Sequence, residues 1–469
     1  MLKTKLTDKQ IRLLEHLIGI TVILMITVRY YFVYPFNVDS KDYYQWARCI
    51  NLGMLPYRDF NMLQTPLSAY FSALFYKINT SIFFIHVLPL TITVFITIYF
   101  SAKMISCRVP NSRIFPIYLW AIISMVICSA LYNMMSLMFW VIGLYAYTVY
   151  KAEKKTCYLA LAGVSAGLCF FTKQNTAALM IAAFGVIFIS NWIKDKAKAK
   201  TVIREFLTLW LSFLAVMEIG LMIFFIQGNL NEFFEYTFFS TKDFVISNAD
   251  ASVIVLVGII VVAGIIGFIS KEIEMGISGA FAALMAFPIV NLHHLIFTFL
   301  FISVIADINI STNNRKAFSV LLALSMFIAQ AEQTIPIVLI DTPDADIKAY
   351  VFEIKESDKI IDYLKDKNAS KYHIIDVWSG YFSIYYDRYD KFYDLFLDGN
   401  LGKRTQTDVI KETIGTEKGS YFLVRITKYK DDEANKLVSD NAKKAIKYIQ
   451  DNCKYECSIN EDYSVYKIL

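Results

Sequence analysis

The sequence predicts a polytopic α-helical membrane protein that carries a small soluble α/β domain at its C-terminal end. The chain has 469 residues and is 56% hydrophobic, whereas ordinary soluble domains are roughly 45–50% apolar. The excess lies before residue 341, in repeated apolar runs of about 16–25 residues, the length that crosses a hydrocarbon core. From Asp341 onward the composition is that of a water-soluble domain. We therefore expect a transmembrane domain at 1–341, with an outer loop at 35–81, and a soluble extracytoplasmic domain at 342–469.

The bulk numbers also exclude some classes of protein. The net charge of +5 is small for this length and no basic stripe stands out, so nucleic acid is not an expected partner. The first apolar run follows a polar, basic stretch and is long enough to remain a span, which argues against a cleavable signal peptide. The seven cysteines show no metal-ligand spacing. Cys453 and Cys457 form a disulfide or stay as free thiols, depending on the compartment.

The apolar runs predict about eleven membrane spans. Their expected positions are 15–34, 82–102, 114–130, 133–150, 157–171, 176–193, 206–226, 252–270, 274–290, 293–308 and 317–340.

Charge in the short connections predicts the orientation of these spans. Lysine and arginine gather in four segments, which are the N-terminus, 103–113, 151–155 and 194–200. All four fall on one side if the span count is right, and the positive-inside rule makes that side the cytoplasm. The loops at 35–81, 172–176, 227–251 and 290–293 and the C-terminal domain are then expected to face outward.

The outer loop after the first span predicts two interfacial helices joined by a turn. The first helix opens at Asp39 and repeats Tyr43, Trp46 and Ile50 at helical spacing. The second is expected to begin with Thr65 as N-cap and Pro66 in its first turn. Its apolar stripe predicts a helix that lies in the membrane interface, and the stripe consists of Leu67, Tyr70, Phe71, Leu74, Phe75 and Ile78.

This loop resembles that of the GT-C superfamily of membrane glycosyltransferases. The matching residues are "DxxxY" from Asp39 to Tyr43 and "GMLPYRDF" from Gly53 to Phe60. The loop is most similar to those of the lipid A aminoarabinose transferases and the protein O-mannosyltransferases, in which an acidic pair precedes a surface helix. At the position of the second acid this sequence has Ser40, so Asp42 or Asp59 would have to supply the second carboxylate.

The resemblance implies transfer of a sugar from a polyprenyl-phosphate carrier, and this chemistry explains the carboxylates. Transfer needs a base or an orienting carboxylate beside the acceptor hydroxyl, and Asp39 and Asp59 are the catalytic candidates. A partly dry interface is expected to raise the pKa of such a carboxylate. Plain structural roles also fit, because aspartate is a common N-cap and turn residue. Within the same motif, Asp42, Tyr43, Tyr57 and Arg58 are weaker candidates for substrate binding.

Lys173 breaks the positive-inside pattern, because "GLCFFTKQNTAALM" joins two spans on the expected outer side. A lone lysine can snorkel to the interface without a function. Asn175 or Thr176 is expected to cap the next helix, and a cation beside a helix N-terminus favours an anion. The stretch is also similar to the "LTK" turn of the aminoarabinose transferases, which implies that Lys173 binds the lipid phosphate. Gln174 is a plausible neighbour of the same site.

A histidine pair marks a third outer point, in "FPIVNLHHLIF". His293 and His294 loosely resemble a motif at the outer start of a late GT-C span, which implies binding of the donor phosphate or sugar. An inert interfacial position for both residues fits equally well. Their spacing is not that of a zinc site.

The soluble tail alternates helices and strands. Helices are expected in "KESDKIIDYLKDK", in "RTQTDVIKETI" and at 432–452, and strands in "KYHIIDVW", "YFSIYYDRY", "SYFLVRITK" and "YSVYKIL". This alternation predicts a small α/β domain with a mostly parallel sheet. A glycine-rich phosphate loop is missing, so nucleotide binding is not expected.

The resemblance therefore implies an inverting glycosyltransferase of the bacterial cytoplasmic (inner) membrane that acts at the extracytoplasmic face. Its expected partners are a polyprenyl-phosphate sugar donor, membrane lipids and a glycan, lipid or protein acceptor. No cofactor is expected and metal dependence stays open, although Asp39 and Asp59 alone would not make a credible divalent-metal site. A flippase or other transporter is the main alternative, but it would carry charges near the bilayer midplane. An O-antigen polymerase or ligase is a second alternative, although such enzymes usually place arginines in large late outer loops.

Overall fold

The computed structural model describes most of the chain. The described residues are 7–32, 40–110, 112–127, 129–195, 199–239, 253–287, 292–312, 357–367, 371–375, 404–426 and 440–469. Two compact units divide the chain. The first unit contains Met1–Tyr34, Val87–Ile223 and Ala249–Ile340, and the second contains Pro35–His86, Phe224–Asn248 and Asp341–Leu469.

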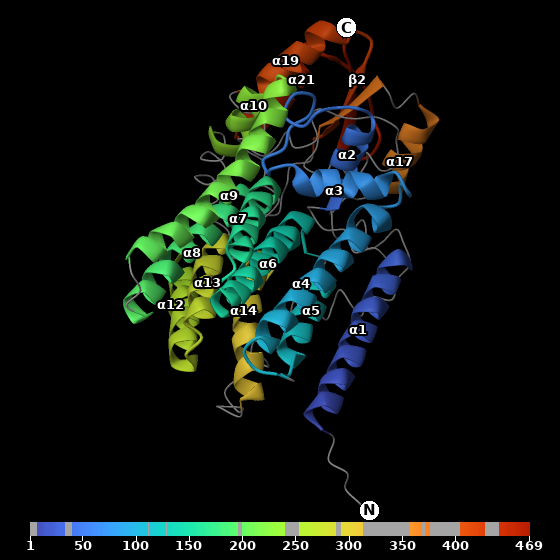
Figure 1. The fold of residues 1–469 in the computed structure, drawn as a ribbon. Coiled ribbons are helices and arrows are strands. Elements are labelled where there is room, and N and C mark those ends of the chain that lie inside the picture. Colours follow the sequence, from blue (N-terminus) through green and yellow to red (C-terminus); the bar gives the residue numbers. More distant parts are fainter. Residues whose placement is uncertain are drawn as a thin grey trace, which may run out of the picture. The chain divides into compact units, whose positions relative to one another are not determined.

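The first unit is a bundle of apolar helices that run alongside one another (Figure 1). Its elements are α1 (Asp8–Phe32), α4 (Leu88–Ser106), α5 (Phe115–Val126), α6 (Leu131–Glu153), α7 (Thr156–Thr172), α8 (Gln174–Asp195), α9 (Ala199–Ile226), α12 (Val253–Ser270), α13 (Ile273–Ala283), the short η3 (Leu284–Ala286) and α14 (Leu292–Ser311). Each of the first ten predicted spans corresponds to one of these helices, and the predicted span at 317–340 lies outside the described residues.

Five helices in the described part of the chain are long and apolar enough to cross a membrane. They are Asp8–Phe32, Phe83–Ser106, Gln174–Lys194, Ala199–Ile226 and His293–Ser311. Several others are apolar but shorter, so the count of about eleven spans stays a prediction. The surface of the bundle suits a lipid environment, because α9 exposes Leu211, Leu214 and Ile219. A water-facing helix would carry polar side chains at such positions.

Helix α6 is the most enclosed element of this bundle. It packs against α4 and α7, and its buried residues run from Leu131 to Tyr150 on nearly every face. A helix that is apolar all round is a core helix. Its polar residues therefore lie at its two ends, where other helices also begin or end.

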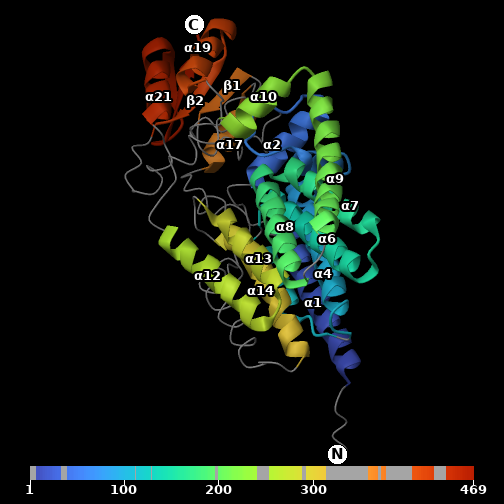
Figure 2. The ribbon, with the colours of Figure 1, turned by 60° about the vertical axis from the view of Figure 1, so that its left-hand side comes forward.

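A pair of glycines allows α12 and α13 to approach closely (Figure 2). A Cβ added to Gly267 would lie 2.3 Å from the Cα of Gly276, which is a backbone atom that a rotamer change cannot move away. Small residues permit such backbone contact between helices in a membrane.

The second unit contains both predicted interfacial helices, α2 (Ser40–Asn51) and α3 (Leu67–Tyr76). Asn51 joins them, because its Nδ2 donates to the Ala47 carbonyl at 2.7 Å and to the Ala73 carbonyl at 3.0 Å. The predicted Thr65 cap is wrong: Pro66 occupies the N-cap position of α3, and no side chain caps that end. The fixed φ of proline suits a helix start without a capping side chain.

Helix α3 turns its small residues inward and leaves part of the predicted apolar stripe exposed. Ser68 and Ala73 are buried, whereas Leu74 is 61% exposed. The exposed apolar side chain suits a helix that lies against lipid, as predicted for the interface.

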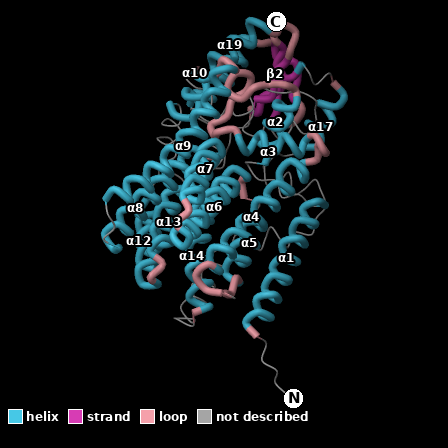
Figure 3. The backbone as a smooth tube through the Cα atoms, viewed as in Figure 1, coloured by secondary structure: helices cyan, strands magenta, loops and turns pink. Residues whose placement is uncertain are grey.

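All strands in the described residues belong to the C-terminal part of the chain (Figure 3). Four strands form one sheet in the order β1-β2-β4-β3. They are β1 (Tyr372–Ile375), β2 (Tyr421–Arg425), β3 (Lys454–Ser458) and β4 (Tyr463–Lys467). Strands β1, β2 and β4 were predicted, β3 was not, and the predicted strand "YFSIYYDRY" lies outside the described residues.

The prediction of a mostly parallel sheet is wrong. Only the β1–β2 pair is parallel among the described strands, whereas β2–β4 and β3–β4 are antiparallel. Residues 459–462 join β3 to β4, and so short a connection can form only an antiparallel hairpin.

Helices α17 (Ser357–Asp366), α19 (Gln406–Thr416) and α21 (Asp440–Asn452) occur where helices were predicted. Helix α19 begins with a reciprocal capping box between Thr405 and Asp408. Helices α19 and α21 bury their apolar faces on the sheet, together with Phe422, Val424 and Ile468. Cys453 and Cys457 are free thiols in this structure.

The close approach of α12 and α13 leads to a stability prediction. Gly267→Ala should lower the free energy of unfolding by about 1–3 kcal/mol, because the methyl group would meet backbone atoms. Gly258→Ala on the same helix is the matched control, since a Cβ there has nothing within 4 Å. The control should be neutral or stabilising by up to about 1 kcal/mol. Thermal unfolding in detergent measures both, and equal unfolding temperatures would contradict the packing.

Candidate functional site

Lys173 lies at the junction of two helices in the first unit. It alone separates α7 from α8, in an extended conformation with φ −157° and ψ 107°. Its amide donates to the Cys169 carbonyl at 2.8 Å and its carbonyl accepts from the Ala177 amide at 3.3 Å. The prediction of a cap at Asn175 or Thr176 is therefore wrong, because α8 already begins at Gln174. Lys173 itself ends one helix and precedes the next.

The ammonium group of Lys173 is buried and contacts an amide oxygen and two aromatic rings. The residue is only 8% exposed. Its Nζ donates to the Oδ1 atom of Asn133 at 2.6 Å, and it lies 4.9 Å from the ring centre of Tyr132 and 5.9 Å from that of Phe297. An amide oxygen and two ring faces hold a cation in place without removing its charge.

Three helices begin around this ammonium group. Asn133 lies in the first turn of α6, Lys173 directly precedes α8, and Phe297 lies near the start of α14. The N-terminal end of each helix carries a partial positive charge and free amide donors. Together with the lysine, these helix ends make the region electropositive in an apolar bundle, which favours a bound anion.

The structure brings His293 to the same place as Lys173. The Asn133 Nδ2 atom, which belongs to the same amide that binds Lys173, lies 3.5 Å from the His293 carbonyl oxygen. His293 and His294 occupy the first turn of α14 and are half-buried. We refer to Lys173, Asn133, Tyr132, Phe297 and His293 as the Lys173 cluster.

Asn133 was not predicted from the sequence, although it contacts both Lys173 and His293 in this cluster. It is fully buried at the start of α6, and it contacts Lys173 with its oxygen and His293 with its nitrogen. The only signal in the sequence is a polar residue at the first position of a predicted span, which capping explains equally well.

The second unit contains the loop that links α2 to α3. Asp59 accepts two hydrogen bonds from Arg58, at 2.9 and 2.8 Å, and one from the Leu55 amide at 2.7 Å. The Arg58 side chain and the Leu55 amide hold the pKa of Asp59 below its usual value. The expected upward shift is therefore wrong for Asp59, because the favourable hydrogen bonds outweigh its limited burial. Its carboxylate stays ionised at neutral pH.

Tyr57 anchors this loop by packing. It is 3% exposed and adopts φ +70°, a left-handed conformation that is unusual for a tyrosine. Its hydroxyl donates to the Gln64 carbonyl at 2.7 Å, and its ring lies edge-on to Phe224 and Phe233. Asn229 supports the same turn by donating to the Pro56 carbonyl at 2.9 Å. These contacts give Tyr57 a structural role beside its predicted role in substrate binding.

Two further predicted residues lie on α2. Asp42 occupies the first turn, where the helix dipole favours an acid. Tyr43 is fully buried and stacks on the ring of His86, with centres 5.0 Å apart and an interplanar angle of 9°. His86 belongs to η1 (Phe83–Val87), a π-helical turn of the kind often found at functional sites. Asp39, the leading catalytic candidate, lies outside the described residues.

No group of three or more His, Cys, Asp and Glu side chains in the described part of the chain could hold a metal ion.

Comparisons with known proteins identify the fold. No protein-family model and no curated protein matches the chain by sequence. The structure is similar to that of ArnT from Cupriavidus metallidurans in the apo state, with a TM-score of 0.59, 8% identity and coverage of 97% of each chain. It is similar to the same protein bound to undecaprenyl phosphate, with a TM-score of 0.57, 9% identity and coverage of 97% of this chain and 98% of that chain. The predicted likeness to the lipid A aminoarabinose transferases is thus confirmed at the level of the fold.

The packing of Tyr57 leads to a second prediction. Tyr57→Ala should destabilise the protein by about 3–5 kcal/mol, because a buried aromatic ring is lost. Tyr57→Phe keeps the ring and should cost about 1 kcal/mol, for the lost hydrogen bond to the Gln64 carbonyl. Leu74→Ala, at a position that is 61% exposed, is the control and should change little. Thermal unfolding and limited proteolysis of residues 53–64 measure the effect, and equal stability of all three variants would refute the anchor role.

Proposed function

We propose that this chain is an integral membrane glycosyltransferase that moves a sugar from a polyprenyl-phosphate donor to an acceptor at the extracytoplasmic face of the bacterial inner membrane. The observation that carries the proposal is the Lys173 cluster, a buried cation where three helices begin. The fold adds support, because ArnT has the same fold and one of its structures contains undecaprenyl phosphate.

In this proposal, Lys173 binds the phosphate of the donor. The acceptor oxygen attacks the anomeric carbon, the bond from that carbon to the phosphate oxygen breaks, and the polyprenyl phosphate leaves with one more negative charge. An ammonium group held in an apolar site stabilises charge that develops on the leaving group. Attack from the face opposite the phosphate inverts the anomeric centre, and no protein nucleophile is needed.

The acceptor proton is assigned to a carboxylate of the outer loop. Asp39 and Asp59 remain the candidates, and their roles differ in this proposal. Asp59 has a lowered pKa because of Arg58, so it is a weak base that suits orientation of the acceptor hydroxyl. Asp39 is the proposed general base. His293 and His294 are proposed to contact the phosphate or the sugar from the start of α14.

A donor-turnover assay tests this function. Purified full-length protein is incubated with a panel of polyprenyl-phosphate sugars, and release of polyprenyl phosphate is followed. Lys173→Gln should lower turnover about 10²–10³-fold, because one stabilising group for the leaving charge is lost. Asp39→Asn should lower it by about 10²–10⁴-fold, the usual contribution of a general base.

Controls separate loss of function from loss of folding. Lys154→Gln removes an exposed lysine from the far end of α6 and should keep full turnover. Thermal unfolding should be similar for all variants. Wild-type protein that turns over no member of the panel, or Lys173→Gln protein that stays fully active, would exclude the proposed function.

The role of Asn133 leads to a separate kinetic prediction. Asn133→Ala removes the hydrogen bond that positions the Lys173 ammonium, and it should raise the KM for the donor by about tenfold or more. The pH profile should keep its shape, because no titrating group is changed. Ser136→Ala, one turn further along α6 and also buried, is the control and should keep the wild-type KM. An unchanged KM in Asn133→Ala would show that Lys173 is positioned without it.

A further inference from the structure

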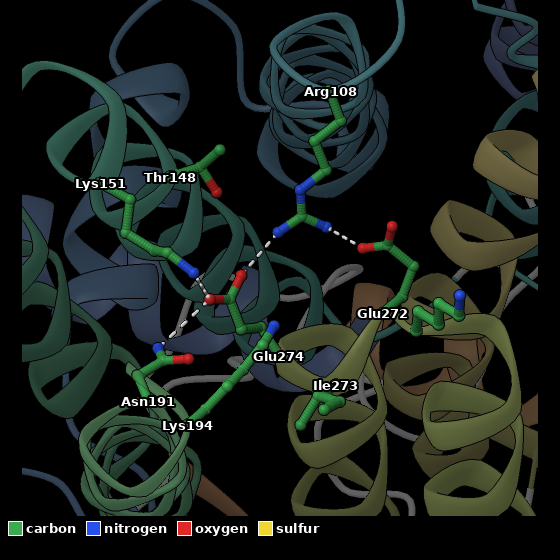
Figure 4. Close-up of a pocket in the computed structure, with 9 residues that line it drawn as sticks. Arg108, Thr148, Lys151, Asn191, Lys194, Glu272, Ile273 and Glu274 are labelled. Carbon is green, nitrogen blue, oxygen red and sulfur yellow. Dashed lines mark hydrogen bonds and ion pairs between the residues drawn. The ribbon is translucent and has the colours of Figure 1, made fainter. Parts of the chain in front are cut away.

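A polar cavity of about 230 Å³ lies at the C-terminal ends of α6 and α8 (Figure 4). Lys173 lies at the N-terminal ends of the same two helices. It forms where α4, α6, α8 and α12 end and α13 begins. The charged residues that line it are Arg108, Lys151, Lys194, Lys271, Glu272 and Glu274. None of these six lining residues was among the predicted site residues, and none takes part in the proposed reaction.

Two of the basic groups form ion pairs with the two acids. Arg108 bridges both carboxylates, with its Nη1 atom 2.5 Å from Glu272 and its Nη2 atom 2.7 Å from Glu274 (Figure 4). Lys151 pairs with the second oxygen of Glu274 at 2.5 Å. Asn191 also lies 3.4 Å from that oxygen. The acids are thus neutralised within this network.

Two lysines remain without such a partner. Lys194 and Lys271 line the cavity, and neither forms an ion pair with an acid of the described residues. Four basic and two acidic side chains leave the lining with a formal charge of +2. Cations at the C-terminal ends of α8 and α12 also interact with the helix dipoles. That interaction explains their presence at helix ends but not their convergence on one cavity.

Apolar surface adjoins both lysines. On α8, Ile189 and Ile193 are 54% and 72% exposed, and Ile193 directly precedes Lys194. On α12, Ile265 and Phe268 are 50% and 76% exposed, less than two turns before Lys271. A ligand that meets this arrangement needs an anionic group for the cavity and apolar chains for the helix surfaces.

We propose that this cavity binds the phosphate group of an anionic phospholipid, whose acyl chains lie along α8 and α12. Lys194 and Lys271 supply the positive charge. The ion pairs of Arg108 with Glu272 and Glu274 hold the lining of the cavity in place. The cavity is too small for a whole lipid but accommodates a headgroup phosphate. The basic connections at this end of the bundle agree with a leaflet rich in anionic lipid. The inference does not depend on the transferase activity.

Lipid titration of the purified full-length protein tests the site. Short-chain phosphatidylglycerol, phosphatidylcholine and inorganic phosphate are titrated separately, and binding is followed by native mass spectrometry and thermal stabilisation. Phosphatidylglycerol should bind and stabilise the protein, whereas the other two should have little effect. In the double variant Lys194→Gln/Lys271→Gln the affinity for phosphatidylglycerol should fall about 30-fold, because two lysines near one phosphate are lost.

The double variant Lys154→Gln/Lys155→Gln is the matched control, because it removes two exposed lysines at the same end of α6. It should bind phosphatidylglycerol like the wild type. Equal weakening in the control would mean general attraction to a basic surface and would overturn the site. Unchanged binding in Lys194→Gln/Lys271→Gln would overturn it too. Inorganic phosphate that binds as tightly as the lipid, or displaces it, would overturn the lipid assignment in favour of a free phosphate.

Discussion

The proposed site depends on the burial of the Lys173 ammonium group against Asn133 and two aromatic rings. A charge removed from water costs several kcal/mol unless polar groups replace its hydration. Part of the replacement comes from the Asn133 amide oxygen and two aromatic faces, which hold the cation in position. The N-terminal ends of α6, α8 and α14 each carry a partial positive charge. They disfavour a buried cation in this region and favour a bound anion. In the proposed function, the phosphate of the lipid-linked donor is that anion.

The apolar bundle explains why polar chemistry gathers at helix ends. Helix α6 is enclosed on nearly every face, and a charge in its middle would have neither water nor a partner. Its first turn carries Asn133 of the Lys173 cluster, and its last turn carries Lys151 of the cavity that Arg108, Glu272 and Glu274 line. One buried helix therefore connects two electropositive regions that serve different proposed ligands.

The second unit uses a different strategy to hold its polar loop. Aromatic packing around Tyr57 and the hydrogen bond from Asn229 fix the turn, while Asp59 is satisfied by Arg58 and a backbone amide. This arrangement makes the turn rigid but also lowers the pKa of its carboxylate. A carboxylate with a lowered pKa is a weak base, so the proposed reaction assigns orientation of the hydroxyl to Asp59 and the base role to Asp39.

The sequence by itself determined the helices and their order. Long apolar runs can satisfy their backbone groups in lipid only as helices, so ten of the apolar helices could be placed from composition alone. Local sequence patterns also predicted the amphipathic stripes of α2 and α3 and the position of Lys173 between two helices.

Tertiary structure decided the rest. Sheet order depends on which strands meet, so β4 could not be predicted to pair antiparallel with β2. Partners from distant segments also escaped prediction: Asn133 meets Lys173 across 40 positions, and Arg108 meets Glu272 across 164. Such contacts arise from helix packing, which no local pattern in the chain records.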